Sequence, residues 1–270
     1  MAKTRVAIHG AAGRMGQRLI ALAAADKELS ICAAIEGAGH SRLGQDAGLV
    51  AGIGELGVPL ADTLAADTLS ANCDVVIDFS VPAGTVAICR TCRERKLPLV
   101  VATTGLEREQ MEELRAASAE IPLLWSPSMS LAVNLAMKLS GIAGAALADH
   151  PSGADVEIIE RHHRFKEDSP SGTALRFGEI IAAAMGQKHV QHGRSGRPGA
   201  RPHDEIGYHA VRTGDNPGEH TIIFGLLGET LELTVRATNR DCYAHGALAA
   251  AKFLAHQKPG MYGINDMLGL

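Results

Sequence analysis

The sequence lacks an excess of positive charge and a long apolar run. Its 26 lysine and arginine residues are outnumbered by 30 aspartate and glutamate residues, so the net charge is −4. A chain with that balance has no overall basic field to attract nucleic acid. No apolar run approaches the roughly 20 residues that span a bilayer, and residues 1–8 are too short and too strand-like for the apolar region of a signal peptide. We therefore expect a cytoplasmic protein whose partners are neither nucleic acid nor membrane.

Cysteine is also scarce, and its spacing is irregular. Of the five cysteines only Cys89 and Cys92 form a C-x-x-C pair, and we expect that pair on a helix over residues 86–96, where positions three apart share a face. No second pair and no suitably spaced histidines complete a zinc site. The interpretation is two inert, partly buried thiols, and we expect no metal.

Up to residue 130, short apolar runs alternate with helical patterns. Strands followed by helices predict right-handed βαβ units and a parallel sheet covered on both faces, which is the Rossmann-type, doubly wound α/β class. The expected strands are residues 5–9, 31–35, 75–79, 99–102 and 123–125, and the expected helices are residues 15–25, 83–95 and 107–119.

After residue 130 the pattern changes to strands that follow one another without intervening helices, which predicts an α+β domain with a mixed or mostly antiparallel sheet. The polar stretch at residues 187–201, with three glycines and a proline, is the best candidate for a mobile loop. We expect one domain over residues 1–130, a second over 131–240, and a C-terminal segment, 241–270, that packs back on the first. In the second domain, the expected helices are residues 131–147 and 171–185, and the expected strands are residues 156–161, 206–212, 220–224 and 230–237.

A glycine-rich turn follows the first expected strand and opens the first helix. Its glycines, Gly10, Gly13 and Gly16, have the spacing G-x-x-G-x-x-G, with Ala12 where the usual fingerprint has its second glycine. Glycines let the backbone turn tightly and approach a pyrophosphate, which the N–H groups of the helix N-terminus then bind. Glu36 directly follows the second strand, where an acidic residue binds ribose hydroxyls. The combination predicts a dinucleotide site; a structural turn beside a surface glutamate is the alternative.

Two further loops follow expected strands of the same sheet, and the carboxyl ends of such strands are where cofactors bind. Small and hydroxylated residues there suit close approach to a nicotinamide, although each loop taken alone could be an ordinary connection. The residues are Ala102, Thr103 and Thr104 in one loop and Ser126, Pro127, Ser128 and Met129 in the other.

The residues after Glu36 bear on whether the cofactor carries a 2′-phosphate, as NADPH does. NADPH usually requires a cation beside the acidic residue that binds ribose, but Glu36 is followed by Gly37. A charge pair at about 4 Å is worth roughly 4 kcal/mol at an effective dielectric constant of about 20. The sequence therefore favours NADH, and NADPH stays open because Arg14 or Arg42 could replace the missing cation.

A second group of polar residues runs from the end of an expected strand, through a charged loop, into a helix. Proline suits a first helical turn, and the free N–H groups with the hydroxyls of Ser171 and Thr173 form an anion site. Lys166 and at least one of His162 and His163 would lie nearby, because a loop can bring them together. Taken singly, Lys166 could be solvated, and the histidines could be polar core residues or metal ligands. The group as a whole indicates a site for a carboxylate substrate.

These motifs together resemble the dihydrodipicolinate reductase family, whose activity is 4-hydroxy-tetrahydrodipicolinate reduction. The resemblance spans nearly the whole chain, and the combination is specific although no single piece is. The matching segments are 10–16, 78–80 (DFS), 103–105 (TTG), 157–160 (EIIE), 162–166 (HHRFK), 170–174 (PSGTA), 212–215 (RTGD) and 218–221 (GEHT).

The resemblance implies a role for each candidate. Residues 1–130 would form the dinucleotide-binding domain and 131–240 a substrate-binding and oligomerisation domain of a homotetramer. His162 would donate or accept a proton, Lys166 would donate one, and the substrate's carboxylates would be held beside them. The pyrophosphate would be held by Gly10, Ala11, Ala12, Gly13, Arg14 and Met15, the adenosine ribose by Glu36, the nicotinamide by residues 102–104 and 126–129, and the dicarboxylate by His163, Gly172 and Thr173, with Ser171 added from the helix start.

The implied reaction reduces a cyclic hydroxylated imine dicarboxylate, with loss of water, to tetrahydrodipicolinate. Two residues depart from the family pattern: Gly37 replaces a basic residue often found after the ribose-binding glutamate, and Val81 replaces an arginine found in some members. Both departures bear on NADPH and not on the reaction. Two other functions stay open, a Rossmann dehydrogenase that acts on an alcohol or amine, and a dinucleotide sensor without catalysis.

Overall fold

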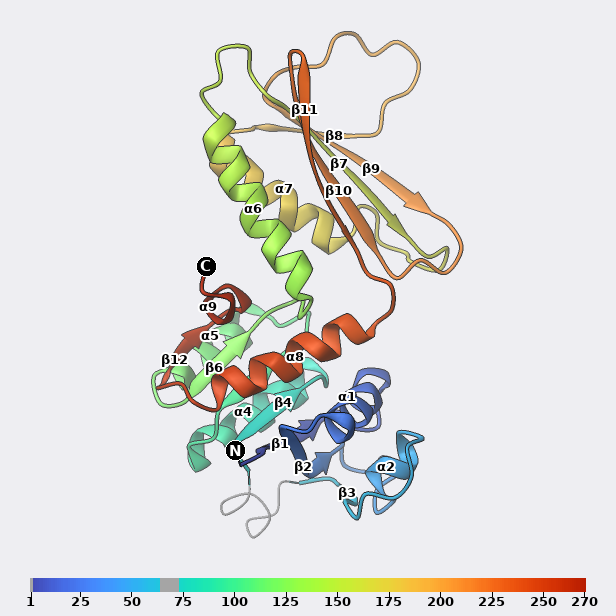
Figure 1. Cartoon of the computed structure of the whole chain (residues 1–270), viewed down its shortest axis with the longest axis vertical. Helices are drawn as coiled ribbons and strands as arrows, with labels where there is room; N and C mark the ends of the chain where they lie inside the picture. The colour runs from blue at the N-terminus through green and yellow to red at the C-terminus, as the bar shows by residue number, and fades with distance from the viewer. Residues whose placement is uncertain (1, 64–72) are drawn as a thin grey trace. The chain divides into compact units, whose positions relative to one another are not determined.

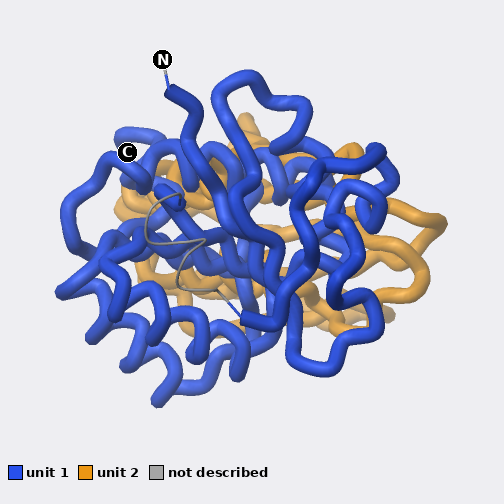
Figure 2. Tube along the Cα trace, turned by 90° about the horizontal axis from the view of Figure 1, so that it is seen from below, with its two compact units in different colours: residues 1–130, 241–270 blue, residues 131–240 orange. Residues whose placement is uncertain are grey.

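The structure is a computed structural model that describes residues 2–63 and 73–270. The chain divides into two compact units, coloured separately in Figure 2. Unit 1 comprises residues 1–130 and 241–270 and contains both chain ends, and unit 2 comprises residues 131–240. The boundaries between the units fall at residues 130 and 240. The roles expected of the two segments stay predictions.

Unit 1 is built on a seven-stranded sheet in which every neighbouring pair is parallel. Its central strands are runs of Val, Ile and Leu that are almost fully buried, as expected of a sheet covered on both faces. The Rossmann-type prediction is confirmed. In spatial order the strands are β12 (Gly260–Tyr262), β6 (Pro122–Trp125), β5 (Leu99–Val101), β4 (Val75–Asp78), β1 (Thr4–His9), β2 (Leu29–Ile35) and β3 (Leu60–Ala61).

The order of the strands reverses beside β1, since β2 lies on one side of it and β4 on the other. In doubly wound sheets the ligand binds outside the carboxyl ends of the strands at that switch point. The residues that end β1 and β4 are His9 and Asp78. The fold therefore predicts a ligand site at the edge of the sheet that also carries the glycine turn.

The helices of unit 1 cover this sheet, and the C-terminal segment is among them. α8 packs against β4, β5, β6 and α1. It lies beside these strands although more than a hundred residues separate it from them in the sequence (Figure 1). Cys89 and Cys92 lie in α4 and are 1% and 0% exposed in the apolar core, and burial raises the pKa of Cys89 to about 11. The helices are α1 (Arg14–Ala25), α2 (Ala47–Val50), α4 (Pro82–Arg95), α5 (Arg108–Ser118), α8 (Asp241–Leu254) and α9 (Ile264–Leu268).

Unit 2 contains a five-stranded mixed sheet with two helices packed together, α6 (Leu131–Leu147) and α7 (Gly172–Met185) (Figure 1). The pairs β7–β9 and β8–β9 are parallel, and β7–β10 and β10–β11 are antiparallel, which confirms the predicted mixed sheet. In spatial order the strands are β11 (Glu229–Arg236), β10 (Glu219–Leu226), β7 (Asp155–His162), β9 (Glu205–Arg212) and β8 (His189–His192).

The stretch expected as a mobile loop, residues 187–201, contains a strand, β8. The sequence of β8, HVQH, has one apolar residue and no alternation, so only its pairing with β9 reveals it. Arg194 and Arg201 further fix the loop, since both bind Glu157 of β7. Short elements such as β3, β12, α2 and α9 were likewise not predicted.

Candidate active site

The glycine turn of unit 1 is closed by backbone contacts that leave no room for side chains. Gly10 has φ +79°, and a Cβ atom there would lie 2.6 Å from the carbonyl oxygen of Phe79. A Cβ atom on Gly16 would lie 2.1 Å from the carbonyl oxygen of Gly10. The Gly13 N–H donates to that same oxygen at 3.1 Å. Glycine is therefore required at positions 10 and 16 for the turn to pack against α1 and β4.

The start of α1 and Glu36 complete this turn. Gly13 is the N-cap of α1 and, having no side chain, covers none of the first N–H groups of the helix. The Glu36 carboxylate accepts from the Ala12 N–H at 2.9 Å and from the Gly37 N–H at 2.9 Å. The sequence placed Glu36 at the end of β2, and the structure brings its carboxylate to the turn.

Asp78, at the end of β4, is a buried carboxylate that joins neighbouring elements. It is 0% exposed, and its Oδ1 atom lies 2.7 Å from His9 Nδ1 and accepts from the Ser80 hydroxyl at 2.6 Å. Its Oδ2 atom accepts from the hydroxyls of Thr85 and Thr103 at 2.6 and 2.8 Å. Burial alone would raise the pKa of Asp78, but these hydrogen bonds outweigh burial and lower it.

The two loops expected near the nicotinamide are fixed to this edge. Thr103 is bound to Asp78, and Trp125 Nε1 donates to the Thr103 carbonyl at 3.4 Å. The Ser126 hydroxyl donates to the Ser128 carbonyl at 2.7 Å. Thr104 and Pro127 are exposed, Ala102 and Met129 are buried, and Ser128 is half-buried.

The residues that bear on the phosphate preference are all open to solvent. Arg14 is the first residue of α1 and is exposed, as is Arg42. A Cβ atom on Gly37 would meet no atom within 4 Å among the residues that the structure describes. The glycine at position 37 is therefore not imposed by packing.

In unit 2, β7 changes from apolar to polar along one face. Val156 and Ile158 are fully buried in the core, and Glu160 and His162 continue the same face at 1% and 8% exposure. Side chains two apart share a face of a strand. The same face of β7 therefore belongs to the apolar core at its start and carries Glu160 and His162 at its end.

Glu160 binds three partners. Its Oε2 atom lies 2.6 Å from His162 Nδ1, and the Arg212 guanidinium donates to both oxygens at 2.8 and 2.7 Å. The Ser171 N–H donates to Oε1 at 3.0 Å. Burial would raise the pKa of Glu160, but the bonds from Arg212 and His162 lower it. Burial also lowers the pKa of His162, although Glu160 opposes that shift.

The loop after β7 holds Lys166 against the start of α7. Lys166 Nζ lies 2.7 Å from Asp168 Oδ1, and this ion pair, with a hydrogen bond from the Gly172 backbone, lowers the pKa of Asp168. His163 is half-buried, and its Nδ1 atom is buried without a hydrogen-bond partner among the described residues. The loop thus holds a lysine that is paired with Asp168 and an imidazole nitrogen that is buried without a described partner.

The start of α7 differs in one respect from the expectation. Pro170 precedes the N-cap, which is Ser171, and so lies outside the first turn. The Ser171 hydroxyl is 2% exposed, accepts from the Ala174 N–H at 3.2 Å and lies 3.0 Å from His220 Nε2. Capping therefore uses that hydroxyl, and Gly172 and Thr173 are left as the more accessible residues of the turn.

His220 is a site residue that sequence reasoning missed. It is 4% exposed, and its ring meets the His162 ring edge-on at a centroid distance of 5.2 Å. Burial, and then the charge of His162, lower the pKa of His220 to about 4. The segment 218–221 was recognised as a motif, but it contained no signal that β10 pairs with β7.

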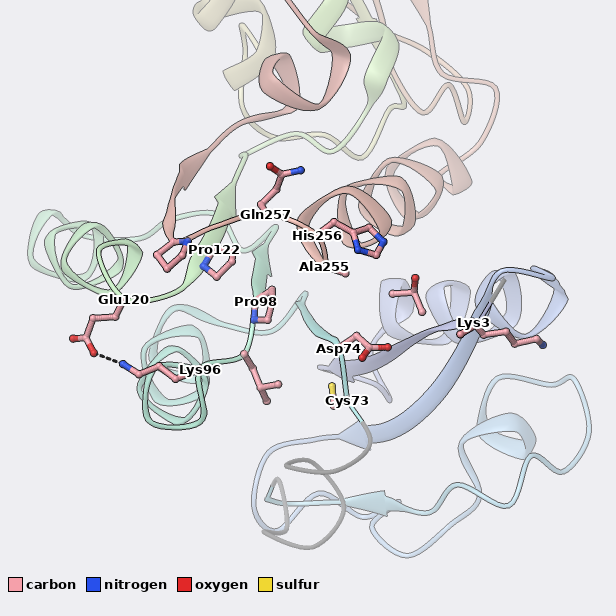
Figure 3. Close-up of a pocket in the computed structure, with 14 residues that line it drawn as sticks. Lys3, Cys73, Asp74, Lys96, Pro98, Glu120, Pro122, Ala255, His256 and Gln257 are labelled. Atoms are coloured by element: carbon pink, nitrogen blue, oxygen red, sulfur yellow. Dashed lines mark hydrogen bonds and ion pairs between the residues drawn. The ribbon is translucent and has the colours of Figure 1, made fainter.

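A cavity of about 900 Å³ in unit 1 lies at the opposite ends of the strands (Figure 3). Its lining includes Lys3, Asp74 and Pro122, which precede or begin strands. Two charged residues at its rim, Lys96 and Glu120, point toward each other and form an ion pair at 2.6 Å. None of the site residues expected from the sequence lines this cavity.

Comparison with known proteins agrees with this geometry. A family model described as dihydrodipicolinate reductase, N-terminus, matches residues 4–129, and one described as dihydrodipicolinate reductase, C-terminus, matches residues 132–268. The chain belongs to the dihydrodipicolinate reductase family. It is accordingly an oxidoreductase, and the Rossmann-type unit implies a nicotinamide cofactor.

Individual relatives support the same family. A 4-hydroxy-tetrahydrodipicolinate reductase from Rhodopirellula baltica is 55% identical over 267 residues, covering 97% of this chain and 95% of the relative. One from Alkalilimnicola ehrlichii is 44% identical over 270 residues, covering 99% of both. A dipicolinate-bound dihydrodipicolinate reductase structure from Paenisporosarcina sp. TG-14 matches with a TM-score of 0.77 and 23% identity over 97% of each chain. Because its identity is only 23%, this last similarity is evidence for the fold alone.

Proposed function

We propose that the chain reduces (2S,4S)-4-hydroxy-2,3,4,5-tetrahydrodipicolinate to (S)-2,3,4,5-tetrahydrodipicolinate with loss of water, a step of the diaminopimelate route to L-lysine. The observation that carries this proposal is the group formed by His162, Lys166 and the start of α7 in a chain of this family. A dehydrogenase for simple alcohols or amines has no need of such an anion site, and a sensor has no need of its proton donors.

Unit 1 is proposed to bind the cofactor. The fit is supported by the tight turn, where Gly10 and Gly16 leave no space for side chains, and by the uncovered N–H groups of α1. Glu36 has lone pairs left for ribose hydroxyls, and residues 102–104 and 126–129 are proposed to contact the nicotinamide. When bound, the nicotinamide supplies the hydride.

Unit 2 is proposed to bind the dicarboxylate and to manage protons. Lys166 and the Gly172 N–H would hold one carboxylate, which takes the place of the Asp168 carboxylate that contacts both. His163, whose Nδ1 atom has no hydrogen-bond partner among the described residues, and the Thr173 hydroxyl are proposed to bind the other carboxylate once the loop admits it. Ser171 stabilises this turn as the N-cap of α7, where its hydroxyl accepts from the Ala174 N–H.

The proton steps follow from the electron count. Loss of water generates a conjugated imine, and addition of hydride leaves an electron pair that must take a proton. His162 or Lys166 supplies that proton through a nitrogen that faces the substrate, and histidine suits the task because its ordinary pKa is about 6.5. In the dehydration, one of these groups protonates the departing hydroxyl while a basic nitrogen takes the proton that the adjacent ring carbon loses, so this step consumes no net proton.

NADH is the favoured cofactor, because no cation follows Glu36 and position 37 carries no side chain.

We also propose a cytoplasmic homotetramer that assembles through the sheet of unit 2. The edge strand β11 of that sheet leaves Leu231 41% exposed, and the β10–β11 turn leaves Leu227 85% exposed. In the part of the chain that the structure describes, no helix has the length and apolarity to cross a membrane.

The deciding experiment follows NADH and NADPH oxidation by absorbance while the preceding synthase generates the substrate from pyruvate and aspartate semialdehyde. Rapid oxidation that depends on the synthase is the expected result, with NADH the better donor. A folded protein that binds NADH but oxidises neither cofactor would overturn the proposal and favour another dehydrogenase or a sensor.

A further inference from the structure

We propose that Glu160 is a positioning residue of this reductase: together with Arg212 it fixes which nitrogen of His162 faces the substrate and links that ring to the loop that carries Lys166. The inference deepens the proposed function and rests on its assignment of His162 and Lys166. Glu160 itself, at 1% exposure, would touch neither substrate nor cofactor.

The first argument concerns the tautomer of His162. An ionised carboxylate only accepts hydrogen bonds, so the 2.6 Å contact between Glu160 Oε2 and His162 Nδ1 requires a proton on Nδ1. In the neutral ring Nε2 then carries the lone pair, and it is Nε2 that gains or loses the proton in catalysis. A carboxylate that orients a catalytic imidazole in this way is the arrangement of the serine protease triad.

The second argument concerns the room around Nε2. The backbone of Gly218 passes beside it, and a Cβ atom on that residue would lie 2.9 Å from His162 Nε2. A glycine at this position therefore leaves the working nitrogen uncovered. The ring is held from one side by Glu160 and is bounded by His220 on another.

The third argument is a continuous set of contacts between the two proposed proton donors. The Arg212 guanidinium binds both oxygens of Glu160 and also donates to the Asp168 carbonyl at 2.6 Å. The Asp168 carboxylate in turn pairs with Lys166 Nζ at 2.7 Å. The Thr213 N–H donates to the His162 carbonyl at 2.9 Å, which fixes the end of β7 to the end of β9. One buried carboxylate thus organises both donors.

Electrostatics gives the expected direction of a pH effect. The charged or titratable groups that act on His162 are Glu160 on its own strand, Lys166 on the following loop, Arg212 on β9 and His220 on β10. Glu160 is the one that raises the pKa of His162, and burial, Lys166 and Arg212 all lower it. Removing the negative charge must therefore lower the pKa of His162 further.

The test is Glu160→Gln, which keeps the shape and removes the charge. We expect kcat to fall at least about tenfold with a smaller change in KM. If protonated His162 is the donor, kcat/KM falls as pH rises through its pKa, and that limb should move about one pH unit lower in the variant. Nitrogen-15 NMR of the His162 ring reads the tautomer directly and needs no turnover, and we expect the wild-type Nδ1–H form to be lost.

The chain offers a matched control in Glu157→Gln. Glu157 lies on the same strand and also binds arginines and a histidine, with Arg194 at 2.7 Å and His209 at 2.7 Å. Three residues along a strand reverse the face, so it lies opposite Glu160 and His162. We expect this control to keep the wild-type pH limb and the wild-type His162 spectrum.

If Glu160→Gln does not fold, Arg212→Lys is the second variant, because lysine keeps the charge but cannot bind both carboxylate oxygens and the Asp168 carbonyl. We expect a fall in kcat of several fold with the tautomer retained. Wild-type kcat and tautomer in Glu160→Gln, or equal losses in both glutamine variants, would overturn the inference. An inactive wild-type enzyme that still shows the Nδ1–H tautomer would instead count against the proposed function alone.

Discussion

Asp78 in unit 1 and Glu160 in unit 2 form two similar arrangements with different surroundings. Each is a fully buried carboxylate on a central strand, and each lies within 2.7 Å of the Nδ1 atom of a histidine, His9 or His162. Both carboxyl groups have a pKa below the ordinary value because hydrogen bonds outweigh burial. In each unit, one buried carboxylate organises the edge that carries the candidate site.

The difference lies in the other donors. Asp78 is bound by hydroxyls of Ser80, Thr85 and Thr103, which hold loops in place without adding charge. Glu160 is bound on both oxygens by the Arg212 guanidinium, so its charge is paired and the neighbouring histidine is left to titrate. Hydroxyl donors suit an edge that positions a bound group, and a paired carboxylate suits one that moves protons.

The largest effect that would test this difference is expected for Lys166→Ala. Loss of a proton donor should lower kcat by roughly 10²-fold or more, with NADH affinity unchanged because the change lies in unit 2. Steady-state kinetics and NADH fluorescence titration measure the two quantities. The control is Lys188→Ala, at an exposed lysine of the same unit. Wild-type turnover in the Lys166 variant would remove unit 2 from the proton chemistry.

Gly10→Ala in unit 1 should weaken cofactor binding, which the Lys166 variant should leave unchanged. The added methyl group meets the Phe79 carbonyl and forces the turn open, so we expect NADH to bind at least about tenfold more weakly, in line with a cost of about 1–3 kcal/mol for a strained backbone. Gly52→Ala is the control, because it has a similar φ of +75° but no atom within 4 Å of a Cβ among the described residues. Equal NADH affinity in the two variants would contradict a tight turn that holds the cofactor.

A stability effect is expected from His220. Its pKa is about 4 in the folded state and 6.5 in the unfolded chain, so between these values the unfolded state binds a proton that the folded state does not. Stability from this group is complete above pH 6.5 and is lost as pH falls toward 4, by about 2 kcal/mol between pH 7 and pH 5. Urea unfolding at the two pH values should show that His220→Gln removes this part of the dependence. His203→Gln, at a side chain that is 81% exposed, is the control; an undiminished pH dependence in the His220 variant would refute the assignment.

The smallest effect concerns cofactor choice. Gly37→Arg places a cation beside Glu36 at a position where the side chain meets no described atom within 4 Å. We expect the ratio of NADPH to NADH affinity to rise about tenfold, less than the full value of a charge pair because the site is exposed. Gly37→Gln separates charge from length and should leave the ratio near that of the wild type. A ratio unchanged by arginine would point to Arg14 or Arg42 as the phosphate ligand.

Much of the fold could be predicted because its signals are local. Apolar runs such as residues 99–101 and the glycine spacing of residues 10–16 mark strands and a turn without reference to the rest of the chain. β8 escaped prediction because its residues are polar and its only support is the neighbouring strand. The hydroxyl of Ser171 was expected to face a ligand, but it caps α7 and lies against His220, since a buried polar group must find a partner inside.

The candidate site shows the same division. Local signals in the sequence predicted a strand over residues 156–161, the loop with Lys166, a helix from about Ser171 and the acidic residue after the second strand, because each signal lies in neighbouring residues. The folded structure was needed to show that Arg212, 52 residues from Glu160, binds its carboxylate, and that His220 lies against His162. Strand pairing brings those residues together, and the low dielectric of the interior then decides which buried charges must be paired.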